Sequence, residues 1–234
     1  FRIPLDWKIF LTLSLLVPIY HLYKKRKVDL PKIKLTKYNI FIFLAIFIFS
    51  VSLYMYAKGA FAYPYLEDED PWGHTVGMKY VAREKTAFDP DFKEVEGFNQ
   101  VLSYVDPYPP AYDVILGVLH QTSKDLRWTA KFFNSLMVSL GLLFFFFFAK
   151  RFSKNSNKAI LATFFLAAVP SYLSHFIWAH TLAITLFFPI MYAFILIEED
   201  KRWWYIAAIM VAGLWVSQNL SQPIKITTMI LLYL

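Results

Sequence analysis

Residues 38–57, YNIFIFLAIFIFSVSLYMYA, form a continuous run of apolar and aromatic side chains without a single charged residue. A bilayer core of about 30 Å needs roughly 20 such residues in one helix, so this stretch predicts a membrane-spanning helix. The composition of the chain agrees, because 58% of its 234 residues are hydrophobic, more than in ordinary globular proteins. We therefore expect an all-α integral membrane protein, folded as a polytopic helical bundle.

Apolar runs on both sides of this stretch predict further spans, and about six to seven in total. They lie at residues 7–23, 129–149, 159–177, 182–197, 203–216 and 226–234. Residues 58–127 form a long polar insertion, in which the apolar run 111–121 is too short to cross a bilayer and predicts a short re-entrant or interfacial helix. We expect one transmembrane domain over residues 1–234, and its start at Phe1 and apolar end predict a fragment of a longer chain.

The positive charge of the chain lies in short links between apolar runs. Residues 24–37 hold seven Lys/Arg against one Asp, and residues 150–158 hold four Lys/Arg and no acid. Excess Lys/Arg in short links marks the cytoplasmic side, so these two links are predicted inside. Counting sides along the chain from them places the link 198–202 inside as well. The insertion 58–127, the turn 174–181 and the link 217–225 then lie outside. Topology and lipid headgroups explain these charges, so we expect no nucleic-acid partner.

The insertion is acidic, which the positive-inside rule does not explain. Between residues 58 and 113 it carries eleven Asp/Glu against five Lys/Arg, and four of the acids are consecutive at 67–70. Asp70 followed by Pro71 predicts a helix start, because Asp accepts orphan backbone N–H bonds and Pro suits the first helical position. His74 follows Asp70 by one turn, where an Asp–His hydrogen bond is expected. The face of this helix is predicted to contain His74, Gly77, Met78 and Val81.

Two interpretations of the acidic helix stay open. In the first, it is a capped interfacial helix with solvated acids. In the second, a carboxylate at the outer end of a span binds a divalent cation, or acts as a base, at a phosphate-bearing substrate. Costly polar groups near membrane depth are functional hypotheses by default. On the predicted outer side these candidates are Asp68, Asp70, His74, His120, His175, His180, Gln218 and Gln222.

The segment 67–81, EDEDPWGHTVGMKYV, resembles the first outer-loop motif of oligosaccharyltransferase catalytic subunits, which are membrane glycosyltransferases of the GT-C superfamily. Asp70-Pro71-Trp72 matches the end of the family's acidic cluster, and Lys79-Tyr80 matches the Lys-Tyr pair that follows it. Residues 108–120, YPPAYDVILGVLH, resemble the Tyr-Pro stretch that opens a short re-entrant helix near the end of the same loop.

The resemblance implies roles for individual residues. Asp70 would be the catalytic carboxylate that contacts the acceptor and a divalent cation, Mg²⁺ or Mn²⁺, with Asp68 as a paired acid. The family's second acidic motif corresponds to residues 171–184, where His180 matches the histidine and Trp178 replaces the acid. This departure favours a broader GT-C enzyme, with Asp70 and His180 as candidate metal ligands. The candidate phosphate- or substrate-binding residues are His74, His175, His180, Gln218 and Gln222.

We thus expect a glycosyltransferase that transfers a sugar or oligosaccharide from a polyprenyl-phosphate-linked donor to an unidentified acceptor. The reaction would take place on the extracytoplasmic side of a prokaryotic plasma membrane or an ER-type membrane, in contact with lipid and other membrane subunits. The alternative is a non-catalytic subunit or scaffold whose acidic loop docks a basic partner. A transporter is disfavoured, because no Asp, Glu, Lys or Arg lies in the middle of a predicted span.

Overall fold

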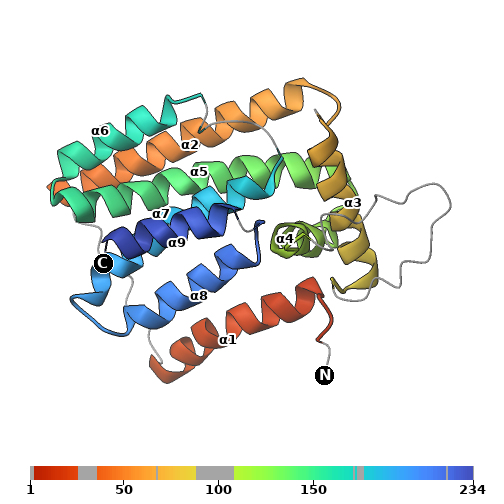
Figure 1. Cartoon of the computed structure of the whole chain (residues 1–234), viewed down its shortest axis with the longest axis horizontal. Coiled ribbons are helices and arrows are strands. Elements are labelled where there is room, and N and C mark those ends of the chain that lie inside the picture. Colours follow the sequence, from red (N-terminus) through yellow and green to blue (C-terminus); the bar gives the residue numbers. More distant parts are fainter. Residues whose placement is uncertain are drawn as a thin grey trace.

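The described part of the chain is helical and contains no strand. The structure, a computed structural model, describes residues 3–25, 36–66, 68–87, 108–170, 172, 177–219 and 221–233. Its helices, shown in Figure 1, are α1 (Trp7–Lys25), α2 (Lys37–Ala62), α3 (Glu69–Glu84), α4 (Ala111–His120), α5 (Leu126–Ser153), α6 (Ser156–Ala167), α7 (Ala179–Ile197), α8 (Trp203–Trp215) and α9 (Ser221–Tyr233). The all-α prediction is confirmed.

Three helices in the described ranges are long and apolar enough to cross a membrane. They are α2 over Asn39–Ala62, α5 over Leu126–Ser153 and α7 over Ala179–Ile197, and they indicate a membrane protein. The predicted total of six to seven spans is not reached by this criterion. The reason is length: the 13 residues of α8 rise about 20 Å at 1.5 Å per residue, short of a bilayer core.

The span predicted at 159–177 is interrupted. Helix α6 begins at Ser156, where the Asn155 side chain accepts hydrogen bonds from the backbone N–H groups of residues 157 and 158, and it ends after 12 residues at Ala167. Pro170 follows closely, and its ring and missing N–H oppose a continuing helix. Beyond the break, the Tyr172 hydroxyl donates to the Val138 carbonyl of α5 at 3.1 Å. Apolar composition alone does not reveal this break.

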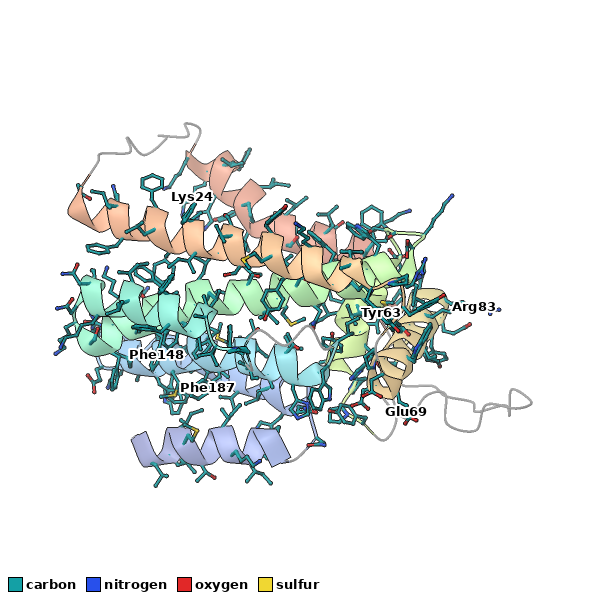
Figure 2. The ribbon with its side chains drawn as sticks, turned by 90° about the horizontal axis from the view of Figure 1, so that it is seen from above. Lys24, Tyr63, Glu69, Arg83, Phe148 and Phe187 are labelled. Atoms are coloured by element: carbon teal, nitrogen blue, oxygen red, sulfur yellow. The ribbon has the colours of Figure 1, made fainter. Side chains whose placement is uncertain are left out.

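The long helices run alongside one another, and α3 and α4 lie across one end of the bundle (Figure 1). One buried cluster, which includes Leu66, Met78, Tyr112 and Ala179, joins α3, α4, α5 and α7 at that end. We call it the α3–α4 end. Figure 2 shows Glu69 and Arg83 there, far from Lys24 and Phe148.

The opposite end of the bundle holds the basic last turns of α1 and α5 and is called the basic end. Helix α5 finishes there with Lys150 and Arg151 in its last turn. Helix α1, which has no buried residue, carries Lys24 and Lys25 in its last turn. Its beginning is attached to the α3–α4 end, because Asp6 pairs with Lys85 at 2.5 Å. Lys24, Lys25, Lys150 and Arg151 thus lie at the opposite end of the bundle from the acidic first turn of α3.

Candidate functional site

Helix α3 follows α2 in the sequence after a short link. Its N-cap is Asp68, whose extended backbone allows the carboxylate to accept the Glu69 N–H at 2.7 Å. The prediction that Asp70 starts the helix is therefore wrong, because Asp70 already lies in the first helical turn. Asp68 and Glu69 are exposed, whereas Asp70 is half-buried. Among these three neighbouring acids, Asp70 is the one that the fold turns towards protein; Glu67 lies outside the described residues.

The predicted apolar face of α3 is confirmed, and it packs on α4. His74, Gly77, Met78 and Val81 are all buried. The two helices cross at Gly117, where an added Cβ would lie 2.6 Å from Val81 Cβ and 2.9 Å from the Met78 carbonyl oxygen. Such distances are too short for real Cβ contacts, so glycine permits the close crossing.

This crossing brings Asp113 of α4 to His74 of α3. His74 Nδ1 lies 2.7 Å from Asp113 Oδ1, and each side chain is 1% exposed. His74 Nε2 accepts the Ala179 N–H at 3.4 Å, so the ring proton is assigned to Nδ1 and is donated to Asp113. The sequence predicted Asp70 as the partner of His74, and the carboxylate found at Nδ1 is Asp113 instead.

Burial dominates the electrostatics of this pair. It raises the pKa of Asp113 to about 6, although the hydrogen bond and charge of His74 oppose that rise. The second carboxylate oxygen, Oδ2, is buried without a hydrogen-bond partner in the described ranges. An apolar site that accommodates a carboxyl group in this way favours its neutral form.

Two tyrosines enclose the pair. The rings of Tyr108 and Tyr112 meet His74 edge-on, with centroid distances of 6.1 and 4.9 Å, and the Tyr112 hydroxyl donates to Asn134 Oδ1 of α5 at 3.2 Å. Burial raises the pKa of Tyr108 to about 12; a hydrogen bond with the Asn219 backbone opposes this, and the negative charges of Asp70 and Asp113 add to it. Tyr108 thus lies between Asp70 and the link from α8 to α9.

The first turn of α7 completes the cluster. The His180 ring packs against Trp178 with a centroid distance of 4.2 Å, and its Nδ1 is buried without a hydrogen-bond partner among the described residues. Asp70, His74 and Lys225 are the groups whose charges act on His180. The charge of Asp70 therefore acts on His180 although the two residues come from different helices.

The α8–α9 link contributes a buried amide. Gln218 is 1% exposed, and its Oε1 accepts the Asn219 N–H at 2.9 Å. Its Nε2 donor is buried without a hydrogen-bond partner in the part of the chain that the structure describes. The link reaches α4 through a hydrogen bond from the Ala111 N–H to the Val216 carbonyl at 2.9 Å.

The predicted site residues are thus brought together only in part. Asp70, His74, His180 and Gln218 lie at the α3–α4 end, and Asp68 lies beside them as an exposed helix cap. His175 and the side chain of Gln222 lie outside the described residues. His120 lies at the other end of α4, where burial lowers its pKa.

Three buried residues were missed by sequence reasoning: Asp113, Asn134 and Lys131. Asp113 interrupts the apolar run of α4, and the other two lie within the apolar helix α5. A polar residue inside an apolar helix was the available signal. Lys131 uses its ammonium group to donate to the Ala60 carbonyl at 2.8 Å and the Tyr63 carbonyl at 2.5 Å, so it fixes the end of α2 on α5.

The residues that the structure describes do not form a metal site on their own. In the described ranges, no group of three His, Cys, Asp or Glu side chains is placed to hold a metal ion. Asp70 and His180 alone supply fewer ligands than the about six that Mg²⁺ takes. We therefore assign no chemical step to a divalent cation.

The site combines a half-buried carboxylate, a buried amide donor and a histidine whose Nδ1 has no hydrogen-bond partner within the described ranges, all at one end of a helical bundle. Such groups can accept a proton from a nucleophile and stabilise developing negative charge. Comparisons of the chain with protein-family models, with curated proteins and with solved structures gave no match.

Proposed function

We propose that this protein is a membrane glycosyltransferase of the GT-C type, which transfers a sugar or oligosaccharide from a polyprenyl-phosphate-linked donor to an acceptor. The position of Asp70 carries the proposal. Its carboxylate follows the membrane-length helix α2, lies in the first turn of α3, and is half-buried while its neighbours Asp68 and Glu69 are exposed. The sequence resemblance around Asp70-Pro71-Trp72 points to the same residue.

The proposed step is a displacement at the anomeric carbon of the donor sugar. The acceptor oxygen or nitrogen attacks that carbon, its proton passes to the Asp70 carboxylate, and the bond from the carbon to the phosphate oxygen breaks. The polyprenyl phosphate leaves with the negative charge. The ring nitrogen of His180 and Nε2 of Gln218 are buried and lack hydrogen-bond partners among the described residues, so they are suited to bind the leaving phosphate when they donate hydrogen bonds.

We assign the α3–α4 end to the extracytoplasmic side and the basic end to the cytoplasmic side. Lys24, Lys25, Lys150 and Arg151 in the last turns of α1 and α5 support this orientation. The six to seven spans expected from the sequence also belong to this proposal: beside α2, α5 and α7, the apolar segments 7–23, 159–177, 203–216 and 226–234 would enter the bilayer. Double Trp at the start of α8 would lie at the interface.

The test is the pair of variants Asp70→Asn and Glu69→Gln, assayed in membranes for release of polyprenyl phosphate from polyprenyl-phosphate-linked hexoses. Loss of a general base lowers the rate by about 10²–10⁴-fold, so Asp70→Asn should lose transfer by at least about 100-fold. Glu69→Gln removes a neighbouring exposed acid and should stay near wild type. Full activity of Asp70→Asn, with an unchanged elution profile in detergent, would refute the assignment.

A non-catalytic scaffold is the second candidate, and the exposed carboxylates of Asp68 and Glu69 favour it. They could contact a basic partner subunit without any chemistry. In that case the single change at Asp70 has little effect, while the double variant Asp68→Asn/Glu69→Gln loses co-purification of the partner. The two functions therefore predict different outcomes for Asp70→Asn: loss of transfer for the enzyme, and little effect for the scaffold.

A further inference from the structure

A pocket lies at the basic end, away from Asp70. It has a volume of about 370 Å³ and opens between the last turns of α5 and α7. From α5 it is lined by Phe147, Lys150 and Arg151, which are spaced to share one helix face, and by Lys154 just beyond the end of that helix.

The lining is basic on balance. Three cationic side chains, Lys150, Arg151 and Lys154, face a single carboxylate, Glu199, so three positive charges less one negative leave +2. Glu199 pairs with Arg151, which orients the guanidinium but uses only some of its five N–H donors. Lys154 ends α5 in the left-handed conformation, with φ of 52°, and is exposed.

The rest of the lining is apolar. Phe147, Tyr192 and Leu196 form this part of the pocket. The ring of Tyr192 also packs edge-on against Trp203 of α8, with a centroid distance of 6.0 Å, which fixes that wall. Tryptophan is typical of the boundary between lipid tails and headgroups, and α5 and α7 are both long enough to span a membrane. The pocket therefore lies where a candidate span meets the headgroup region.

We infer that this pocket binds the headgroup of an anionic phospholipid. The phosphate lies against Lys150, Arg151 and Lys154, and the beginning of an acyl chain lies on Phe147 and Leu196. Basic pockets between membrane helices suit such headgroups, because ammonium and guanidinium groups bind phosphate oxygens with charge-assisted hydrogen bonds. A soluble phosphate would use the cations but would gain nothing from the apolar wall. The inference is independent of the transferase proposal.

Native mass spectrometry of the purified protein in detergent tests this assignment. Phosphatidylglycerol and phosphatidylcholine with identical acyl chains are titrated in parallel, and wild type should retain phosphatidylglycerol preferentially. Each lysine near an anionic surface contributes about 1 kcal/mol, or about fivefold in affinity. The variant Lys150→Gln/Lys154→Gln should therefore bind phosphatidylglycerol about 25-fold more weakly.

The matched control is Lys158→Gln/Lys201→Gln, which removes the same charge from the basic end at two positions outside the pocket lining. It should keep wild-type lipid binding. Equal losses in the two double variants, or equal binding of both lipids by wild type, would overturn the assignment. Competition by sn-glycerol 3-phosphate at millimolar concentration would also overturn it, because the ligand would then be a soluble phosphate. Far-UV circular dichroism confirms that each variant is folded.

Discussion

Replacing Asp113 by asparagine should remove a pH dependence of stability that arises at the α3–α4 crossing. Burial raises the pKa of Asp113 from 3.8 to about 6. Between these values the unfolded chain ionises its carboxyl while the folded protein keeps the proton. Stability from this group is therefore fully present below pH 3.8 and is lost as the pH rises to about 6, opposite to a salt-bridged carboxylate. At 1.36 kcal/mol per pH unit, the loss is about 3 kcal/mol.

The variant Asp113→Asn keeps an oxygen to accept the His74 proton, but it places an amide nitrogen where Oδ2 has no described partner. That buried, unpaired donor lowers the free energy of unfolding by about 1–3 kcal/mol at every pH. The variant is therefore less stable than wild type near pH 4, and it gains about 3 kcal/mol relative to wild type by pH 7.5.

Unfolding in mixed detergent micelles, followed by far-UV circular dichroism from pH 4 to pH 7.5, measures this difference. Other titrating groups are common to both proteins and cancel in the comparison. Parallel pH profiles, with a difference constant to about 0.5 kcal/mol, would show that Asp113 has an ordinary pKa and would refute the reasoning.

Two further pairs of substitutions probe how the end of α2 is fixed and how closely α3 and α4 cross. Lys131→Met removes the hydrogen bonds to the Ala60 and Tyr63 carbonyls, and it should lower the free energy of unfolding in the same micelles by about 3 kcal/mol. The control Lys124→Met, at an exposed lysine, should change the free energy of unfolding by less than about 0.5 kcal/mol. Similar losses in the two variants would contradict the role of Lys131 in fixing the end of α2 on α5. Gly117→Ala, whose new methyl group meets Val81 at 2.6 Å, should destabilise by about 1–3 kcal/mol. Gly59→Ala, with no atom within 4 Å of its new Cβ, should be neutral or stabilising by up to about 1 kcal/mol, and an equal loss at both glycines would count against a tight crossing.

Long apolar runs predict α2, α5 and α7 closely, because few structures other than a membrane helix accommodate so many consecutive apolar residues. The same reasoning fails for residues 159–177. Hydropathy reports side-chain composition, whereas a helix also needs an uninterrupted supply of backbone N–H groups, and Pro170 removes one of them. Beyond the break, the Tyr172 hydroxyl donates a hydrogen bond to the Val138 carbonyl of α5. Hydrophobic periodicity cannot predict such a contact.

The parts of the site that depend on a single helix could be predicted from the sequence, and the contacts between two helices could not. The apolar face of α3 follows from helical spacing, and burial of His74 and Met78 confirms it. The partner of His74 depends on how closely α3 and α4 cross. Gly117 permits the close crossing, and it lies 36 residues after Val81 in the sequence. Sequence reasoning therefore selected Asp70, the nearest acid on the same helix, instead of Asp113.

His74 explains why α7 begins where it does. Trp178, the N-cap residue of α7, makes no side-chain cap hydrogen bond, yet the Ala179 N–H is satisfied by His74 Nε2 at 3.4 Å. Helix starts buried without such a partner are unfavourable, because their first N–H groups lack intrahelical acceptors. One imidazole thus joins α3, α4 and α7. The residue after Ala179 is His180, on which the charge of Asp70 acts.

Asp70, proposed to take the proton of the acceptor, and His180, proposed to bind the leaving phosphate, are therefore positioned by a pair that need not touch either substrate. Asp70 precedes His74 by one turn of α3, and His180 follows the N–H that His74 binds. Because α6 already ends at Ala167, α7 is a separate helix, and its first N–H group, that of Ala179, can bind the His74 imidazole. The early end of α6 and the buried His74–Asp113 pair are then parts of one arrangement, in which the start of α7 lies at the α3–α4 end.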